Sequence, residues 1–275
     1  MPHNPVAGRV LPDLLRYQVE RRPDQEFLIF VDRTGACAGR YTYAQVDALS
    51  DKIAAHLQGI GIGKGDGVCV HLPNVPEFLF CWFGIAKIGA YMVATNLRSA
   101  PDEMEYFLNH SEARALISDT GETAAWEPIL KDCPAIQSEQ IVLFGDAGEI
   151  GARVSGAKIL ESGSGEFEAP ALDAMDLAAV LYTSGTTSRP KGVMITQGNY
   201  VWAAELQVRT QMLSAADRYL VCLPYFHINA QTYSTLPVMS VGGSMVLMER
   251  FSKSRFWDIV GEHKPTVWSY VPALT

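Results

Sequence analysis

One stretch of the sequence combines the side chains that suit a polyphosphate. Thr183–Gly192 reads Thr-Ser-Gly-Thr-Thr-Ser-Arg-Pro-Lys-Gly, with five hydroxyl side chains, two glycines, one proline and one lysine. Gly185 and Gly192 lack a Cβ, so the backbone approaches a ligand closely and its N–H groups form a nest for anionic oxygens. The hydroxyls donate further hydrogen bonds, and Lys191 adds a compact positive charge. The composition therefore favours a phosphate-binding loop between two short predicted strands.

This stretch differs from the common P-loop. That motif requires Gly immediately before its Lys, and Ser or Thr immediately after it. Pro190 and Gly192 occupy those two places here. The alternative interpretation is an ordinary Ser/Thr/Gly surface loop, which a random cluster of these residue types would favour. The family resemblance of the ordered string, given next, favours the phosphate loop instead.

The ordered string also carries a family resemblance. Thr183–Gly192 and the following Val193–Thr196 resemble the signature phosphate loop of the adenylate-forming superfamily. Its members include acyl-CoA synthetases, luciferases and the adenylation domains of nonribosomal peptide synthetases. The usual form has Gly at the position of Ser188. The Ser-Arg-Pro-Lys-Gly version is most similar to the crotonobetaine/carnitine-CoA ligase branch and to related fatty-acid CoA ligases.

The resemblance implies an AMP-forming acid–thiol ligase that works in two half-reactions. A carboxylate attacks the α-phosphorus of ATP, which gives an acyl-adenylate and pyrophosphate, and the thiol of coenzyme A then displaces AMP. Lys191 is implied as a catalytic residue, and the hydroxyl of Thr186, or that of Thr187, is expected near Mg²⁺. The residues implied to bind ATP are Thr183, Ser184, Gly185, Thr186, Thr187, Ser188 and Lys191.

A histidine follows another predicted strand later in the chain. His227 lies at the type of strand end where α/β folds bind ligands, although a packed, hydrogen-bonded histidine is the commoner case. Pro224–His227 is similar to the superfamily's next signature, whose aromatic or His residue lines the carboxylate pocket. The resemblance therefore implies His227 as the second catalytic residue, with Asn229, Gln231 and Thr232 as candidates for the acyl pocket.

Composition and charge argue against several other classes. The net charge of −8 and the pI of about 5.3 argue against nucleic acid as a main partner. Five dispersed cysteines without a Cys-x-x-Cys pair, together with a polar N-terminus, indicate a cytoplasmic protein with reduced thiols. The most apolar stretch, Phe78–Ala94, is too short and too interrupted to span a bilayer, and no ligand spacing suggests zinc.

The elements around these residues alternate between strand and helix. The alternation predicts an α/β fold of layered, mostly parallel sheets flanked by helices. A further helix is expected over 120–136, and Gly145–Pro170 is interpreted as a mobile connection. The predicted strands are Phe27–Val31, Val68–Leu72, Tyr91–Ala94, Ala115–Ser118, Ile141–Phe144, Ala178–Tyr182, Val193–Ile195, Tyr219–Leu223, Met245–Met248 and Thr266–Val271.

The expected organisation is a first α/β subdomain over residues 1–170, then the phosphate-loop region and a partial second subdomain over 171–275. The resemblance covers essentially the whole chain but about half of the family's usual length. It thus implies the N-terminal lobe of the adenylate-forming fold, incomplete at the C-terminus and with the C-terminal lobe absent, which alone is expected to be inactive. A non-catalytic nucleotide-binding or interaction fragment and an adenylation domain with another acceptor remain alternatives. The oligomeric state is open, with a homodimer among the options.

Overall fold

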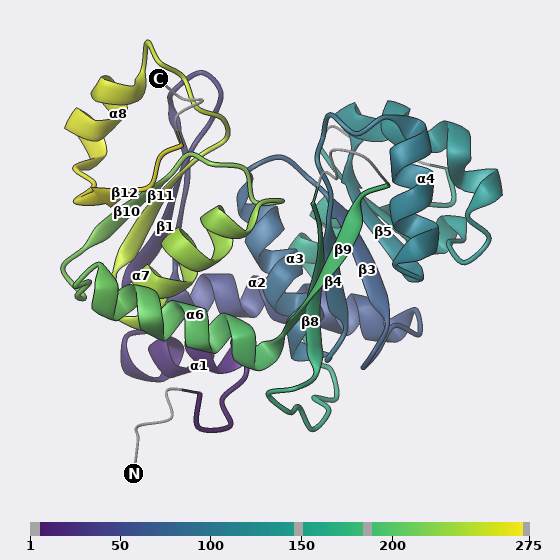
Figure 1. Ribbon diagram of the computed structural model, residues 1–275, viewed down its shortest axis with the longest axis horizontal. Helices are drawn as coiled ribbons and strands as arrows, with labels where there is room; N and C mark the ends of the chain where they lie inside the picture. The colour runs from purple at the N-terminus through teal and green to yellow at the C-terminus, as the bar shows by residue number, and fades with distance from the viewer. Residues whose placement is uncertain (1–5, 146–150, 184–188, 272–275) are drawn as a thin grey trace. The chain divides into compact units, whose positions relative to one another are not determined.

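The computed structural model of the chain describes residues 6–145, 151–183 and 189–271 (Figure 1). These residues fall into two compact units that are discontinuous in sequence. Unit 1 consists of Met1–Asp47, Pro73–Pro76 and Gln197–Thr275, and unit 2 of Ala48–Leu72 and Glu77–Thr196. The subdomain boundary at residue 170 stays a prediction.

Unit 1 is built on a five-stranded sheet in the order β12-β10-β11-β1-β2. In Figure 1 the purple strand β1 lies beside the yellow strand β11, and Leu28 pairs with Met245 in parallel register. Only β2 runs antiparallel to its neighbour. The strands are β1 (Glu26–Val31), β2 (Cys37–Thr42), β10 (Arg218–Val221), β11 (Ser244–Met248) and β12 (Val267–Trp268).

Helical segments pack against both faces of this sheet. On one face, Ile29 and Val31 form a buried cluster with Phe256 and Ile259 of α8. In Figure 1 α6 and α7 lie on the other side of the sheet from α8, and α7 contacts β11. The helices of unit 1 are α1 (Leu11–Arg21), α6 (Gln197–Thr210), a π-helix (Asn229–Thr235), α7 (Leu236–Ser240) and α8 (Phe256–His263).

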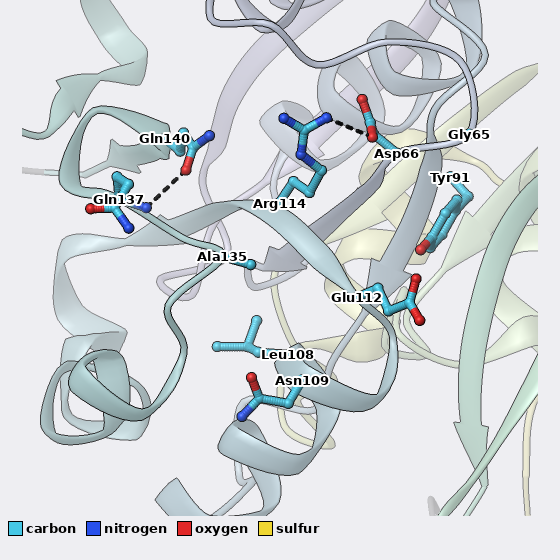
Figure 2. Close-up of a pocket in the computed structure, with 10 residues that line it drawn as sticks. All are labelled: Gly65, Asp66, Tyr91, Leu108, Asn109, Glu112, Arg114, Ala135, Gln137 and Gln140. Atoms are coloured by element: carbon cyan, nitrogen blue, oxygen red, sulfur yellow. Dashed lines mark hydrogen bonds and ion pairs between the residues drawn. The ribbon is translucent and has the colours of Figure 1, made fainter.

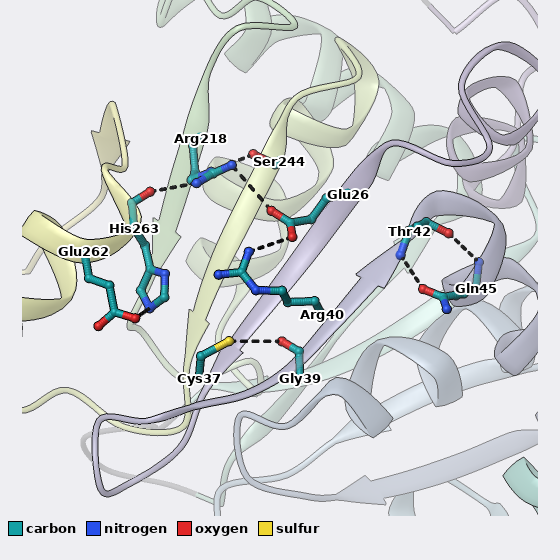
Figure 3. A network of polar contacts seen from close by, with 10 residues as sticks. All are labelled: Glu26, Cys37, Gly39, Arg40, Thr42, Gln45, Arg218, Ser244, Glu262 and His263. Atoms are coloured by element: carbon teal, nitrogen blue, oxygen red, sulfur yellow. Dashed lines mark hydrogen bonds and ion pairs between the residues drawn. The ribbon is translucent and has the colours of Figure 1, made fainter.

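A polar network crosses the strands of unit 1 (Figure 3). Arg218 donates to the hydroxyl of Ser244 at 3.0 Å and to the carbonyl oxygen of His263 at 2.8 Å. Its guanidinium also lies 3.5 Å from a carboxylate oxygen of Glu26, whose second oxygen accepts from Arg40 at 2.7 Å. These contacts connect β2, β1, β11 and β10 with the end of α8.

Unit 2 contains a seven-stranded sheet in the order β7-β6-β5-β3-β4-β8-β9. All neighbouring strands are parallel except the final pair, β8 and β9, which form an antiparallel hairpin. The strands are β3 (Gly67–His71), β4 (Tyr91–Ala94), β5 (Ala113–Asp119), β6 (Ile141–Phe144), β7 (Val154–Ser155), β8 (Leu177–Thr183) and β9 (Lys191–Thr196).

Helices cover the two faces of this parallel sheet, with α3 and α4 on opposite sides in Figure 1. Right-handed crossovers explain this, because β4 lies on one side of β3 and β5 on the other. Phe107 and Trp126 lie in a buried hydrophobic cluster of unit 2, and the Trp126 indole donates to the Ser118 hydroxyl at 2.9 Å. The remaining helices are α2 (Tyr43–Gly59), α3 (Pro76–Lys87), α4 (Pro101–His110) and α5 (Gly156–Ser162).

The predicted α/β class and the mostly parallel sheets are confirmed, while one strand was not predicted and two local predictions are wrong. Strand β2 was missed because it is a short, largely exposed edge strand without an apolar face. The segment 120–136 forms 3₁₀ helices at Thr120–Ala125 and Glu127–Asp132 instead of one α-helix. The supposed connection 145–170 contains β7 and α5, whose first turn is capped by the Ser155 hydroxyl.

Candidate functional site

The phosphate-loop sequence connects the two strands of the β8–β9 hairpin. Thr183, the last residue of β8, pairs with Lys191, the first residue of β9, and both side chains are exposed. Of the predicted nucleotide-binding residues, the structure therefore places these two directly opposite each other. The others, Ser184, Gly185, Thr186, Thr187 and Ser188, lie outside the described residues.

The sheet topology explains why this hairpin is a good place for a ligand. Strand β8 runs parallel to β4, with Leu181 opposite Ala94, so Thr183 lies at the carboxyl edge of the parallel sheet. Ligands of open α/β sheets bind outside the carboxyl ends of their strands. The backbone also requires a small residue here, because a Cβ at Gly192 would lie 2.9 Å from Cγ1 of Val180.

The second predicted site segment, Pro224–His227, follows β10 in unit 1 and is held by the buried side chain of Asn74. The Asn74 amide donates to the carbonyl oxygens of Leu223 at 2.9 Å and Met248 at 3.3 Å. Its oxygen accepts from the backbone N–H of Tyr225 at 2.9 Å. One side chain thus joins the carboxyl ends of β10 and β11 to the segment that carries His227.

Gln231 fixes the same segment from the other side. Its amide nitrogen donates to the carbonyl oxygen of Tyr225 at 2.6 Å, and its oxygen accepts from the hydroxyl of Tyr200 at 2.5 Å. Gln231 is completely buried, and both of its polar atoms are hydrogen-bonded. Gln231 therefore orders the backbone, so its side chain has no free polar atom for an acyl ligand.

The other two acyl-pocket candidates lie in the same π-helix, Asn229–Thr235. Thr232 is buried, and its hydroxyl donates to the carbonyl oxygen of Ile228 at 2.9 Å. Asn229 is half-buried, and its side-chain oxygen makes no hydrogen bond among the described residues. π-Helical turns are rare and frequently mark functional sites. Asn229 is thus the candidate with unused hydrogen-bonding capacity.

His227 itself has an exposed side chain with one face against Phe226. The two ring centroids are 4.1 Å apart, and the His227 backbone N–H donates to the carbonyl oxygen of Pro224 at 3.1 Å. Desolvation by the surrounding atoms lowers the pKa of His227 from its usual value of 6.5. The imidazole is therefore neutral at pH 7, with one donor and one acceptor nitrogen.

The two predicted catalytic residues belong to different units, Lys191 to unit 2 and His227 to unit 1. The sequence failed to identify Asn74 as a residue that supports the site, because a side chain that satisfies distant backbone groups leaves no local pattern. The only available signal was an asparagine in the short turn between β3 and α3, and asparagine is common in turns.

No metal centre is formed by the part of the chain that the structure describes. Within residues 6–145, 151–183 and 189–271, no group of three or more His, Cys, Asp or Glu side chains is arranged to hold an ion. The predicted magnesium contact of Thr186 lies outside these residues and stays a prediction. Among the described residues, no helix has the length and apolar character that crossing a bilayer requires.

A separate pocket of about 450 Å³ lies in unit 2, away from the hairpin (Figure 2). It opens near the amino ends of β3, β4 and β5, where Asp66, Tyr91 and Arg114 line it. An ion pair of 2.8 Å joins Arg114 to Asp66. The pocket therefore occupies the opposite edge of the sheet from Thr183, and two of its charged groups, Asp66 and Arg114, already pair with each other.

Comparison with known proteins gives consistent matches. Residues 15–275 match the family described as AMP-binding enzymes. The chain is 36% identical over 253 residues to a crotonobetaine/carnitine–CoA ligase of Salmonella agona (strain SL483), which covers 91% of this chain and 48% of that ligase. The chain thus spans about half the length of the curated relatives it matches.

Solved structures match over nearly the whole chain. The anthranilate CoA ligase AuaEII in complex with anthranoyl-AMP superposes with a TM-score of 0.90 at 25% identity, covering 97% of this chain and 50% of that one. Apo MbtA of Mycobacterium smegmatis gives 0.87 at 30% identity, covering 97% and 49%. The N-terminal domain of FACL13 from Mycobacterium tuberculosis gives 0.80 at 28% identity, covering 97% and 64%. The expected fold, that of the N-terminal part of adenylate-forming enzymes, is confirmed.

Proposed function

Because this chain belongs to the family of AMP-binding enzymes, we propose that it carries the phosphate-binding and acyl-binding part of an AMP-forming acyl-CoA ligase. The observation that carries the proposal is the β8–β9 hairpin. Its ends are the paired residues Thr183 and Lys191, and its sequence is the phosphate-loop motif. The other feature, the Pro224–His227 segment, is held in place by Asn74 and Gln231.

The reaction forms a thioester at the expense of ATP. A carboxylate oxygen bonds to the α-phosphorus of ATP, and the bond to pyrophosphate breaks. The sulfur of coenzyme A then bonds to the acyl carbon, and AMP leaves. ATP supplies the leaving group that makes the carboxylate reactive. The protein's contribution to such a reaction is to position the reactants and to stabilise charge.

The residues at the hairpin fit the chemistry of a triphosphate. We assign to Lys191 the neutralisation of negative charge on the β- and γ-phosphates, since its exposed ammonium is at the first residue of β9. Thr183 offers a hydroxyl donor opposite it. We assign further hydrogen bonds to Ser184, Gly185, Thr186, Thr187 and Ser188. Mg²⁺ remains a prediction, since the described residues supply no ligand set.

We assign to His227 a place beside the carboxylate substrate. A neutral imidazole donates a hydrogen bond to a carboxylate oxygen without forming a tight ion pair, which would hold back a nucleophile. Phe226 fixes one face of the ring at 4.1 Å. Asn229 is assigned to the acyl side, because its side-chain oxygen makes no hydrogen bond among the described residues.

The acid itself is proposed to be crotonobetaine or carnitine, on the 36% identity to the Salmonella agona ligase. A quaternary ammonium is bound by aromatic faces. Phe226 is half-buried and Tyr233 is 45% exposed, so both rings present surface in the segment that carries His227. The proposed setting is the cytoplasm, and a homodimer is one arrangement to be examined.

The proposal is tested by carboxylate-dependent release of pyrophosphate from ATP, using the longest native polypeptide that contains residues 1–275. Betaine, short-chain, long-chain and aromatic acids form the panel. We expect release with one class of acid and a loss of about 100-fold or more in Lys191→Ala, in the range found for groups that stabilise developing charge. Lys253→Ala, at another exposed lysine, is the matched control and keeps the activity.

The outcomes separate the alternatives. Undiminished release in Lys191→Ala would overturn the assignment of the hairpin. ATP binding without release for any acid would favour a non-catalytic nucleotide-binding protein. Release of pyrophosphate without formation of a coenzyme A thioester would favour an adenylating enzyme with another acceptor.

A further inference from the structure

The second strand of the phosphate-binding hairpin is tied to helix α4 immediately before its lysine. The hydroxyl of Tyr106 donates to the carbonyl oxygen of Pro190 at 3.0 Å, although the two residues are 84 positions apart in the chain. Pro190 directly precedes Lys191, so this hydrogen bond fixes the peptide unit that leads into the lysine. Tyr106 is half-buried, which makes the bond less accessible to competing water.

The ring of Tyr106 makes a second contact with the same turn. The guanidinium carbon of Arg189 lies 5.3 Å from the centre of the Tyr106 ring. A cation within about 6 Å of an aromatic centroid is attracted by the ring quadrupole. One tyrosine thus holds Arg189 by its face and Pro190 by its hydroxyl.

Tyr106 is itself fixed by neighbours that reach the first strand of the hairpin. Its ring lies 4.9 Å from that of His110 and 6.0 Å, edge-on, from that of Tyr182. His110 and Tyr182 are joined by a hydrogen bond of 2.9 Å between Nδ1 and the hydroxyl oxygen. Tyr106 and His110 are four positions apart and share one face of α4.

Tyr182 connects this cluster to both strands of the hairpin. It lies on β8 next to Thr183 and pairs with Gly192 on β9. The centroid of its ring lies 4.3 Å from that of Phe107, a member of the buried hydrophobic cluster that contains Trp126. The two strands that carry Thr183 and Lys191 are therefore attached to α4 through aromatic side chains rather than through the strand pairing alone.

We propose that Tyr106 is a positioning residue of the nucleotide site, which sets the backbone at Arg189 and Pro190 so that Lys191 is presented to the phosphates. The inference rests on the proposed function of the hairpin and names a residue outside the motif. Tyr106 acts through the loop backbone and is assigned no contact with substrate. Loss of its hydroxyl should weaken ATP binding while leaving the acyl site unchanged.

The test compares Tyr106→Phe with Tyr91→Phe in the longest native polypeptide that contains residues 1–275. Both substitutions remove a tyrosine hydroxyl that donates to a backbone carbonyl, at 3.0 Å to Pro190 and at 2.6 Å to Ser111. Tyr91 begins β4, at the opposite edge of the sheet. The measurements are the KM for ATP and the KM for the carboxylate in pyrophosphate release, with the thermal midpoint of each variant.

We expect Tyr106→Phe to raise the KM for ATP about fivefold, the size of one lost hydrogen bond, with an unchanged KM for the carboxylate. Tyr106→Leu also removes the ring that contacts Arg189 and should raise the KM for ATP further. Tyr91→Phe should lower the thermal midpoint without moving the KM for ATP. An unchanged KM for ATP in Tyr106→Phe, or an equal rise in Tyr91→Phe, overturns the inference.

The same assay distinguishes this failure from a failure of the proposed function. If Lys191→Ala retains full release, the hairpin does not bind ATP, and the role of Tyr106 falls with it. If Lys191→Ala loses release while Tyr106→Phe behaves like the unsubstituted protein, the proposed function stands and only the positioning role is refuted.

Discussion

The side-chain oxygen of Asn74 accepts a hydrogen bond from the backbone N–H of Tyr225 at 2.9 Å, across 151 positions of sequence. With its two donated bonds, to Leu223 and Met248, Asn74 satisfies three backbone groups at the carboxyl ends of two strands. Its 5% exposure places all of these bonds out of reach of bulk water. The position of His227 therefore depends on a residue whose own sequence neighbourhood is a strand end and a helix start.

Asn74→Ala is expected to lower the free energy of unfolding by about 3 kcal/mol, because buried backbone groups are left without partners. Urea denaturation measures the change. Asn96→Ala is the matched control, since the Asn96 side chain accepts an exposed hydrogen bond from the backbone N–H of Arg98, and its loss should cost under about 1 kcal/mol. Equal losses of unfolding free energy in the two variants would show that the Asn74 hydrogen bonds stabilise the fold no more than the exposed bond of Asn96 does.

The close approach of α2 and α3 in unit 2 predicts that Gly84 tolerates no larger residue. A Cβ at Gly84 would lie 2.7 Å from the carbonyl oxygen of Ser50 and 2.9 Å from Cβ of Ile53. Gly84→Ala is therefore expected to lower the free energy of unfolding by about 2 kcal/mol through overpacking. Gly59→Ala, at the end of α2 where a Cβ meets no atom within 4 Å, is the control and should be neutral or slightly stabilising. An unchanged free energy of unfolding in Gly84→Ala would show that α2 and α3 move apart at little cost.

Two arginines of unit 1, one of them in the network of Figure 3, are expected to contribute differently to the free energy of unfolding. Arg218→Met removes the donor to Ser244 and His263 from a side chain that is 31% exposed, and should cost about 2 kcal/mol of unfolding free energy. Arg33→Met removes an ion pair with Glu249 from a side chain that is 71% exposed, and should cost less than about 1 kcal/mol. Chemical denaturation of both variants checks the ranking, and a larger loss in Arg33→Met would contradict it.

A buried histidine of unit 2 predicts acid sensitivity. His71 is fully buried at the end of β3, and its Nδ1 lies 2.8 Å from the hydroxyl oxygen of Thr95. Burial lowers the pKa of His71 from 6.5 to about 4. Because the folded pKa is the lower one, the unfolded chain binds the proton first as the pH falls. The contribution to stability is complete above pH 6.5 and is lost between about 6.5 and 4.

The expected loss from this one group is about 3 kcal/mol between pH 7 and pH 4. His71→Gln, which keeps a hydrogen-bonding group but does not titrate, should show a pH dependence of the unfolding free energy that is flatter by this amount. Urea titrations at half-unit pH intervals provide the comparison. Parallel profiles for the two proteins would exclude His71 as the cause.

The elements that the sequence predicted well are those with strong local patterns. The hairpin strands around Thr183 and Lys191 are short apolar runs on either side of a turn-forming string, and the strand before Pro224 is a continuous apolar run. The resemblance identified the proposed phosphate loop for the same reason, since its signal is contained in consecutive residues. Roles for the loop residues 184–188 stay predictions.

The features that escaped prediction depend on distant partners. Whether an asparagine or a tyrosine serves the site is decided by which backbone lies near it, as Asn74 and Tyr106 show. Likewise, β2 is a strand because β1 offers it a free edge, although its own side chains are largely exposed. The segment 120–132 adopts 3₁₀ turns where its apolar spacing alone would permit an α-helix; Pro128 lacks the N–H that a continuous helix needs.

The interior position of β1 in its sheet has a consequence for folding during translation. Strand β1, Glu-Phe-Leu-Ile-Phe-Val, lies between β2 and β11, and its parallel partner β11 begins only at Ser244. On the ribosome, this apolar strand emerges long before the strand that completes its pairing, whereas unit 2 ends at Thr196. Unit 1 must therefore close after unit 2, following an interval in which the unpaired apolar edge of β1 is exposed to aggregation. We thus expect chaperones to bind β1 during translation more than they bind unit 2.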